Sequence, residues 1–287
     1  MHKTYLGQKG YSIYKDSLSI KEEKFIREEL MVKPYLPKSP VQPEPFPIYR
    51  ESPKKFYIPR IFGVNNFGIP NETKITTGDK INIKFNGTLR EKQQVIVDKF
   101  INFIKLGNYG GLLDLYTGFG KTVLGLKIIA ELGVKTLIIV HKGFLVDQWI
   151  ERIEQFLPEA RVGRIQGQII DIENKDIVIG MLQSLSMKEY PDNQFTSFGL
   201  TVVDEVHHIS AEVFVRALQS VVTMYTLGLS ATMNRKDGLT KVFKLFLGDI
   251  IHKEKRKDDN SVIVKAIEYN TTDEEFNEIE YDYRGNP

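Results

Sequence analysis

Residues 113–122 read LDLYTGFGKT, and they join a short apolar run to the helix-like pattern VLGLKIIAEL. Gly118 and Gly120 would let backbone N–H groups converge on phosphate oxygens, and the start of the following helix adds partial positive charge. Lys121 would reach the β and γ phosphates, and the hydroxyl of Thr122 could bind Mg²⁺. The stretch therefore predicts a phosphate-binding loop between a strand and a helix.

Short apolar runs alternate with helix-like stretches from residue 87 onward. Strands are expected at 112–116, 136–140, 176–180, 200–204 and 225–229, and helices at 121–132, 144–156 and 211–221. Such alternation predicts right-handed crossovers onto a mainly parallel sheet that is buried on both faces. Ligands bind at the carboxyl ends of the strands in sheets of this kind.

Polar residues follow two of these strands. Asp204 and Glu205 end the run LTVV, where one acid could hold a metal through water and the other could orient and deprotonate an attacking water. A solvated strand end is the alternative, but the phosphate loop upstream in the same pattern argues against it. Ser230, Ala231 and Thr232 follow the run YTLGL in the same way.

The composition is that of a globular protein of one or two domains. Of 287 residues, 41% are hydrophobic and 26% are charged, and cysteine is absent, which fits a reducing intracellular compartment. Apolar runs such as TLIIV fall far short of the ~18 residues that a membrane span needs, so we expect a soluble protein. His207 and His208 are adjacent among only five histidines, so no transition-metal site is expected.

The first 86 residues lack the alternating pattern and suggest an accessory region. Ser19 and Glu22 form a capping box for a helix that Pro34 would stop, and the proline-rich stretch 33–47 should lie extended. Short strands are expected near residues 57–60. Others are expected within ITTGDKINIKF at 75–85, with a turn at 77–79.

Positive charge is concentrated in the first 90 residues, which hold 16 Lys or Arg against 9 Asp or Glu. Clustered basic charge is typical of surfaces that bind polyanions, because each neutralised phosphate releases counterions. An ordinary solvated surface is the alternative explanation.

The segments TGFGKT, DEVH and LSAT together resemble motifs I, II and III of the first motor domain of superfamily 2 DExH helicases. The resemblance implies a RecA-like α/β domain at 87–250 that uses ATP and Mg²⁺, preceded by a smaller accessory region of mixed α+β structure at 1–86. It implies catalytic roles for Lys121, Asp204, Glu205 and His207. It implies nucleotide contacts for Thr117, Gly118, Phe119, Gly120, Lys121 and Thr122, metal contacts for Thr122 and Asp204, and coupling roles for Ser230, Ala231 and Thr232.

Other segments match the same family in the same order. LREKQ at 89–93 resembles the family's LRxxQ element, which implies that Arg90 and Gln93 belong to the nucleotide site and that Gln93 reads the adenine. The segments HKGFLVDQW and MLQS resemble motifs Ia and Ic, whose loops hold the phosphates of one nucleic-acid strand. These segments and a glycine turn between them imply strand contacts for His141, Lys142, Gly143, Gln148, Gly167, Gln183 and Ser184. Polar loops after strands offer suitable donors, whereas Trp149 is expected in the core.

The pattern LGLSATMNRKDG, together with LVDQW, narrows the resemblance to XPB-like helicases and the transcript-release helicases of large cytoplasmic DNA viruses. That subgroup implies DNA rather than RNA as the track, with RNA polymerase or the transcription machinery as a partner. It also implies a cytoplasmic location, in viral factories or virions, for a viral protein, and a nuclear location otherwise.

A second motor domain is not evident in the sequence. Strands are expected to stop after Leu247, and residues 251–287 are expected to be a linker towards an absent second RecA-like domain. In this superfamily the second domain supplies arginine fingers, which contribute roughly 10³ to 10⁵ to the rate of phosphoryl transfer. We therefore expect residues 1–287 to bind nucleotide but to hydrolyse it very slowly.

Three alternatives remain open. An RNA helicase of the same superfamily would carry the same motifs. A small-molecule kinase would share Lys121 and Thr122 but would not need DEVH and SAT. A non-catalytic module for nucleic acid or polymerase would have a vestigial ATP site, which the intact Asp204 and Glu205 argue against.

Leu115 departs from the phosphate-loop pattern, which has glycine there.

Overall fold

The computed structural model describes residues 2–35, 42–205, 211–231 and 240–255, which belong to one compact unit. Its centre is an eight-stranded sheet with the order β11-β10-β12-β9-β13-β14-β8-β15. The strands are β8 (Gly110–Leu115), β9 (Thr136–Val140), β10 (Val162–Gln166), β11 (Ile169–Ile170), β12 (Ile177–Met181), β13 (Leu200–Asp204), β14 (Tyr225–Ser230) and β15 (Ile250–Glu254). All neighbours are parallel except β10 and β11.

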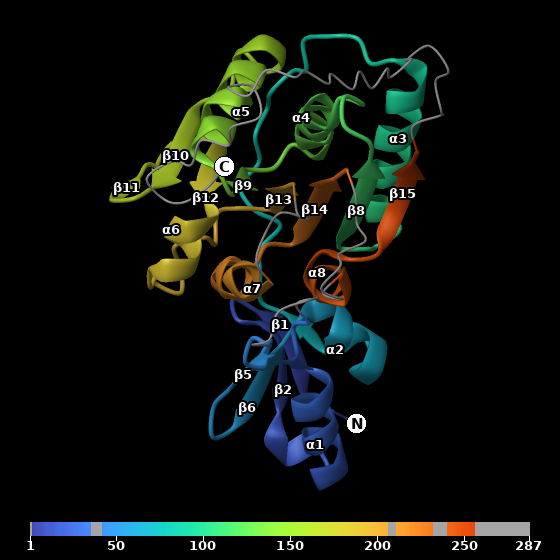
Figure 1. Cartoon of the computed structure of the whole chain (residues 1–287), viewed down its shortest axis with the longest axis vertical. Helices are drawn as coiled ribbons and strands as arrows, with labels where there is room; N and C mark the ends of the chain where they lie inside the picture. Colours follow the sequence, from blue (N-terminus) through green and yellow to red (C-terminus); the bar gives the residue numbers. More distant parts are fainter. Residues whose placement is uncertain (1, 36–41, 206–210, 232–239, 256–287) are drawn as a thin grey trace, which may run out of the picture. The chain divides into compact units, whose positions relative to one another are not determined.

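Helices cover both faces of this sheet (Figure 1). One face packs against α3 (Glu91–Lys105), α4 (Lys121–Leu132) and α5 (Gly143–Phe156), and the other against α6 (Leu182–Met187), α7 (Ala211–Ser220) and α8 (Thr240–Leu247). Neighbouring residues of β8 divide between the two cores, because Leu112 belongs to one and Leu113 to the other. The prediction of a RecA-like, mainly parallel sheet flanked by helices is confirmed.

The N-terminal residues form a second, five-stranded sheet of order β5-β6-β2-β1-β7. Its strands are β1 (Thr4–Gly7), β2 (Gly10–Tyr14), β5 (Arg50–Glu51), β6 (Lys55–Ile58) and β7 (Glu72–Thr73), and a separate pair joins β3 (Met31–Val32) to β4 (Phe46–Pro47). A 3₁₀ turn at Lys15–Ser17, helix α1 (Ile20–Glu29) and helix α2 (Arg60–Phe67) complete the region.

The capping box at the start of α1 is confirmed. The Ser19 hydroxyl accepts from the Glu22 N–H at 3.3 Å, and the Glu22 carboxylate accepts from the Ser19 N–H at 2.8 Å. The helix ends earlier than expected, because Leu30 caps it and Met31–Val32 pairs with β4 instead of continuing to Pro34. The chain therefore changes from helix to strand at Met31, before it reaches Pro34.

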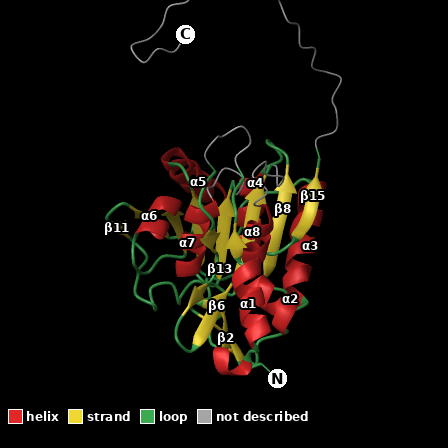
Figure 2. Cartoon of the chain, turned by 60° about the horizontal axis from the view of Figure 1, so that its bottom comes forward, coloured by secondary structure: helices red, strands yellow, loops and turns green. Residues whose placement is uncertain are grey.

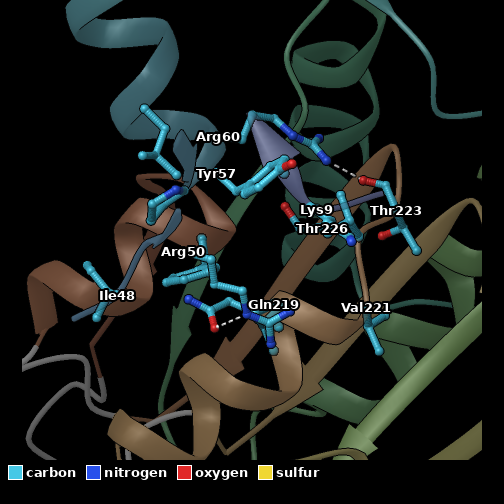
Figure 3. A pocket seen from close by; sticks show the side chains of 15 residues that line it. Lys9, Ile48, Arg50, Tyr57, Arg60, Gln219, Val221, Thr223 and Thr226 are labelled. Carbon is cyan, nitrogen blue, oxygen red and sulfur yellow. Dashed lines mark hydrogen bonds between the residues drawn. The ribbon is translucent and has the colours of Figure 1, made fainter. Parts of the chain in front are cut away.

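Arg60 joins the N-terminal region to the large sheet (Figure 3). Its guanidinium donates to the carbonyl oxygens of Met224, at 2.6 Å, and Thr223, and stacks 4.7 Å from the Tyr109 ring. These three residues come just before β14 and β8. Burial lowers the pKa of Arg60 to about 10, so it stays charged at neutral pH. Arg60 therefore anchors the accessory region at the amino ends of two strands that lead to the phosphate loop and to Ser230.

Residues 75–85 were expected to contain strands, and that expectation is wrong. The structure has only an isolated bridge there, between Lys80 and Val134. The apolar side chains of the segment pack against the α3–α5 side of the large sheet, as shown by Ile83 and by Phe85, which stacks 5.5 Å from Phe156. The alternating apolar residues thus belong to an extended segment that packs against the core of the large sheet.

The expectation that strands stop after Leu247 is also wrong. Strand β15 lies parallel to β8 at the edge of the large sheet, and Lys253 pairs with the buried Asp114 at 2.6 Å. An edge strand needs few apolar residues, which is why IIHKE gave little signal. Residues 256–287, expected as a linker, lie outside the described residues, and the proposed limits at 86 and 250 stay a prediction. No helix among the described residues is long and apolar enough to cross a membrane.

Candidate nucleotide-binding site

The phosphate loop lies between the end of β8 and the start of α4. Gly118 and Gly120 adopt φ values of +86° and +96°, a region that side chains other than glycine rarely enter. This conformation turns the loop directly into the amino end of α4, which begins at Lys121. Leu115, the departure from the phosphate-loop pattern, is fully buried in β8 and belongs to the core.

The LRxxQ element at residues 89–93 is hydrogen-bonded to this loop. The Gln93 amide donates to the carbonyl of Phe119 at 2.9 Å, and the Arg90 guanidinium donates to the same carbonyl. Gln93 also accepts from the Arg90 N–H at 3.0 Å. A Cβ on Gly120 would lie 2.6 Å from the Gln93 amide nitrogen. The structure thus places Arg90 and Gln93 against the loop.

Lys121 is nearly buried and faces the tip of β13. Its ammonium lies 3.1 Å from the Glu205 carboxylate, and its side chain is 9% exposed. Glu205 has φ +50°, which costs free energy for a residue with a side chain and is typical of functional sites. Lys121, which is expected to bind phosphate, is therefore paired with Glu205, which is expected to activate water.

Asp204, the neighbouring acid, is held by two hydrogen bonds. Oδ2 accepts from the indole N–H of Trp149 at 2.8 Å, and Oδ1 accepts from the Glu205 N–H at 2.9 Å. Burial raises the pKa of Asp204 to about 6, although the Trp149 hydrogen bond opposes the rise. The protein thus buries a carboxylate that would be more stable in water.

The strands that carry these residues, β13, β14 and β8, are neighbours inside the sheet. In register, Ser230 of β14 lies opposite Asp114 of β8, and Asp204 of β13 lies opposite Leu229. Figure 2 shows β8 and β15 pointing to the same end. Since β8, β13 and β14 are parallel, the phosphate loop, the two acids and the fully buried Ser230 meet at that end. Ala231 follows Ser230 there, whereas His207 and Thr232 lie outside the described residues.

A comparison with protein families identifies the chain. The family described as "Type III restriction enzyme, res subunit" (ResIII) matches residues 86–235, which is more than half of the chain and contains every residue of the site above. The chain belongs to the ResIII family. The match spans all of the proposed catalytic motifs.

Relatives of this ResIII chain come from large DNA viruses. "Putative ATP-dependent RNA helicase L396" of Acanthamoeba polyphaga mimivirus is 35% identical over 97% of this chain and 54% of its own length. "Putative helicase 161L" of Invertebrate iridescent virus 6 is 33% identical over 67% of this chain and 44% of its own length. The chain thus spans about half the length of these curated relatives. The resemblance to superfamily 2 helicases of large DNA viruses is confirmed.

A solved structure shows the same fold. The UvsW helicase from bacteriophage T4 superposes with a TM-score of 0.61 and 16% identity, covering 88% of this chain and 99% of that one. At this identity the likeness concerns the fold alone. It agrees with the RecA-like architecture that the ResIII sequence predicts.

The residues of the ResIII chain that are expected to contact nucleic acid follow β9, β10 and β12. His141, Lys142 and Gly167 lie outside helices, whereas Gly143 and Gln148 lie on α5, and Gln183 and Ser184 lie on α6, where loops were expected. Two contacts join them in pairs: the Gln183 amide donates to the His141 carbonyl at 3.2 Å, and the Gly167 N–H donates to the Ser184 hydroxyl at 2.9 Å. Lys142 and Gly143 are exposed beside His141, and Gln148 is exposed further along α5. The segments that follow β9, β10 and β12 therefore present polar groups at the same end of the sheet as the phosphate loop.

Two contacts of the site were not predicted from the sequence. Trp149 is buried in the core, as expected, but its indole N–H donates to Asp204. Lys253 of β15 pairs with Asp114 of the neighbouring strand β8. A buried tryptophan needs an acceptor for its N–H. That requirement was the signal in the sequence that could have led to the contact between Trp149 and Asp204.

Replacing Asp204 with asparagine is expected to stabilise the ligand-free chain at neutral pH. The raised pKa means that native Asp204 keeps its proton up to about pH 6, whereas the unfolded chain releases it near the ordinary value of 3.8. The contribution of Asp204 to the wild-type free energy of unfolding therefore falls from about pH 4 to about pH 6 and then levels off. The variant lacks this fall, so it should be more stable by about 3 kcal/mol at about pH 8.

Urea unfolding without Mg²⁺ or nucleotide measures this difference. The gain from Asp204→Asn should be close to zero near pH 4 and reach its full size above about pH 6. An equal gain at both pH values would mean that burial of the charged carboxylate is not the cause.

Proposed function

We propose that this chain is the nucleotide-binding motor domain of an ATP-dependent helicase or translocase that acts on nucleic acid. The observation that carries the proposal is that three groups meet at the carboxyl ends of neighbouring parallel strands. These groups are Lys121, the pair Asp204 and Glu205, and Ser230. The names of the viral relatives support it. A kinase would not require the second and third of these groups.

Each residue of the site has a task in this proposal. Backbone N–H groups of Gly118 and Gly120 bind the phosphates of ATP, and the ammonium of Lys121 neutralises their charge. Phosphate binding draws Lys121 away from Glu205, 3.1 Å distant. The freed Glu205 carboxylate then accepts a proton from the attacking water. Gln93, bonded to the Phe119 carbonyl, ties recognition of adenine to the shape of the loop.

The residues present fit a magnesium ion shared with the phosphates. Magnesium is usually bound through one or two carboxylates, with the remaining ligands from phosphates and water. Among the described residues no group of three or more His, Cys, Asp or Glu could cage a metal, while Asp204 and the Thr122 hydroxyl offer single oxygen ligands. The ion, when bound, would neutralise charge on the transferred phosphoryl group.

We propose DNA as the track, on the strength of the segments that resemble XPB-like and viral transcript-release helicases. The name of L396 favours the RNA alternative. Competition between single-stranded DNA and RNA of one sequence, at one salt concentration, separates the two. Preferential binding of RNA would overturn the DNA assignment. An RNA polymerase or transcription partner, and a cytoplasmic viral setting, follow from the same resemblance.

Lys142→Ala is expected to weaken nucleic-acid binding by removing one phosphate contact. Lys142 is exposed next to His141 at the start of α5. The slope of log K against log salt should become shallower by about 0.9 on duplex DNA or about 0.7 on a single strand. Lys105→Ala provides the control, because Lys105 is an exposed lysine at the end of α3 and lies outside the basic first 90 residues.

Fluorescence anisotropy with labelled oligonucleotides over a range of salt gives both slopes. An unchanged slope for Lys142→Ala, or an equal change for Lys105→Ala, would remove this loop from the binding surface. If no oligonucleotide binds in a salt-dependent way while Mg²⁺·nucleotide does, the chain acts on something other than nucleic acid.

A further inference from the structure

Trp149 is the one tryptophan of the chain and is almost completely buried on α5. Its ring packs against α4 at Gly125, where a Cβ would lie 3.2 Å from the ring and 3.3 Å from Leu229 of β14. Glycine at this position lets α4, which begins with Lys121, approach the indole closely. The ring therefore lies between the helix of the phosphate loop and the strands of the site.

The indole N–H of Trp149 reaches a specific acceptor. It donates to Oδ2 of Asp204 at 2.8 Å inside the core, where Asp204 is 5% exposed. An indole N–H is only a donor, so this contact always presents a hydrogen to the carboxylate. A hydrogen bond to a charged group is roughly twice as strong as a neutral one. Burial in a low-dielectric surrounding strengthens it further.

Together the two hydrogen bonds fix the orientation of the carboxylate. The second, from the Glu205 N–H to Oδ1, comes from the chain itself and is 2.9 Å long. The first comes from a different helix and is the only one of the two that a side-chain substitution can remove. Groups that orient a metal-binding side chain tune its affinity for the metal.

We propose that Trp149 is a positioning residue for the magnesium site: its indole N–H holds the Asp204 carboxylate in the orientation that binds Mg²⁺ with nucleotide. The inference rests on the proposed function, in which Asp204 contacts the ion. It assigns to the core residue of the LVDQW segment a task besides packing. A phenylalanine could replace most of the packing but could not replace the donor.

The test compares the wild-type chain, Trp149→Phe and Ile153→Val. Ile153 is the matched control, because it lies one turn further along α5, is 1% exposed and belongs to the same core. Calorimetry measures how much Mg²⁺ is needed to half-saturate binding of a non-hydrolysable ATP analogue. Trp149→Phe should raise this concentration about 10-fold or more, as loss of an orienting group typically does. Binding of the analogue in EDTA should stay unchanged, since that binding does not use the metal.

Either of two results would overturn the proposal: an unchanged Mg²⁺ requirement in Trp149→Phe, or an equal rise in Ile153→Val. The second would mean that core packing alone is responsible. Thermal unfolding of all three proteins shows whether each is folded.

A second measurement compares wild-type protein with Asp204→Asn and needs no nucleotide. A single tryptophan gives a single indole N–H signal in a ¹H–¹⁵N spectrum. Mg²⁺ alone should move this signal, and Asp204→Asn should shift it in the absence of metal. A signal that ignores both changes overturns the inference. Failure of the wild-type chain to bind the analogue while the indole signal still responds to Mg²⁺ would instead count against the proposed function.

Discussion

Replacing Lys121 with alanine is expected to weaken binding of an ATP analogue by about 100-fold or more. Lys121 directly follows the phosphate loop at the start of α4, and its side chain is only 9% exposed. Truncating one partner of a buried charge pair costs 2–5 kcal/mol or more, and about 2.7 kcal/mol corresponds to 100-fold in affinity. The variant also leaves the Glu205 carboxylate without the 3.1 Å ammonium, so its negative charge repels the incoming phosphates.

Lys127→Ala is the matched control. Lys127 lies on the same helix and pairs with Glu131 at 2.8 Å, away from the phosphate loop. Its removal should leave nucleotide affinity within about twofold, because its partner Glu131 lies on α4 further from the phosphate loop. Unchanged affinity in Lys121→Ala would support the non-catalytic module with a vestigial ATP site.

Gly110→Ala is expected to lower the free energy of unfolding by about 3–5 kcal/mol, through backbone strain and overpacking combined. Gly110 begins β8 with φ +146°, and a Cβ there would lie 1.9 Å from the carbonyl oxygen of Thr226. That oxygen belongs to the backbone of β14, which pairs with β8 in register up to Ser230. The clash therefore cannot be relieved without separating two strands of the site.

Gly107→Ala separates strain from the clash. Gly107 has φ +89° but nothing lies within 4 Å of a Cβ there, so only backbone strain of about 1 kcal/mol is expected. Chemical denaturation of both variants measures the difference. Equal losses in the two variants would contradict the close approach of β8 and β14.

Five strands of the large sheet, β12, β9, β13, β14 and β8, were predictable because they are buried on both faces, whereas β10, β11 and β15 were not predicted. Strands such as LTVVD and TLIIV read as continuous apolar runs, and α4 follows its phosphate loop at the expected residue. Strand β15 was missed because an edge strand tolerates polar side chains such as His252 and Lys253. Residues 75–85 were predicted to contain strands because apolar and polar residues alternate there. The same alternation also occurs in an extended segment that packs against the core of the large sheet without forming a strand.

The candidate site was predictable as a set of loops but not as a set of contacts. Spacing and residue type indicated Lys121 and Asp204, because each belongs to a motif with a mechanism, whereas Gln93 was indicated by the resemblance of LREKQ to the LRxxQ element. Spacing could not show that Gln93 bonds to the Phe119 carbonyl or that Lys121 pairs with Glu205. Those partners depend on how helices and strands far apart in the chain pack together.

A crystal structure of the chain with Mg²⁺ and a non-hydrolysable ATP analogue tests the central claim most directly. We expect the triphosphate along residues 117–122, Lys121 withdrawn from Glu205 onto the phosphates, and the metal between Thr122 and Asp204. An analogue bound elsewhere, with the 3.1 Å pair of Lys121 and Glu205 intact, would contradict the account.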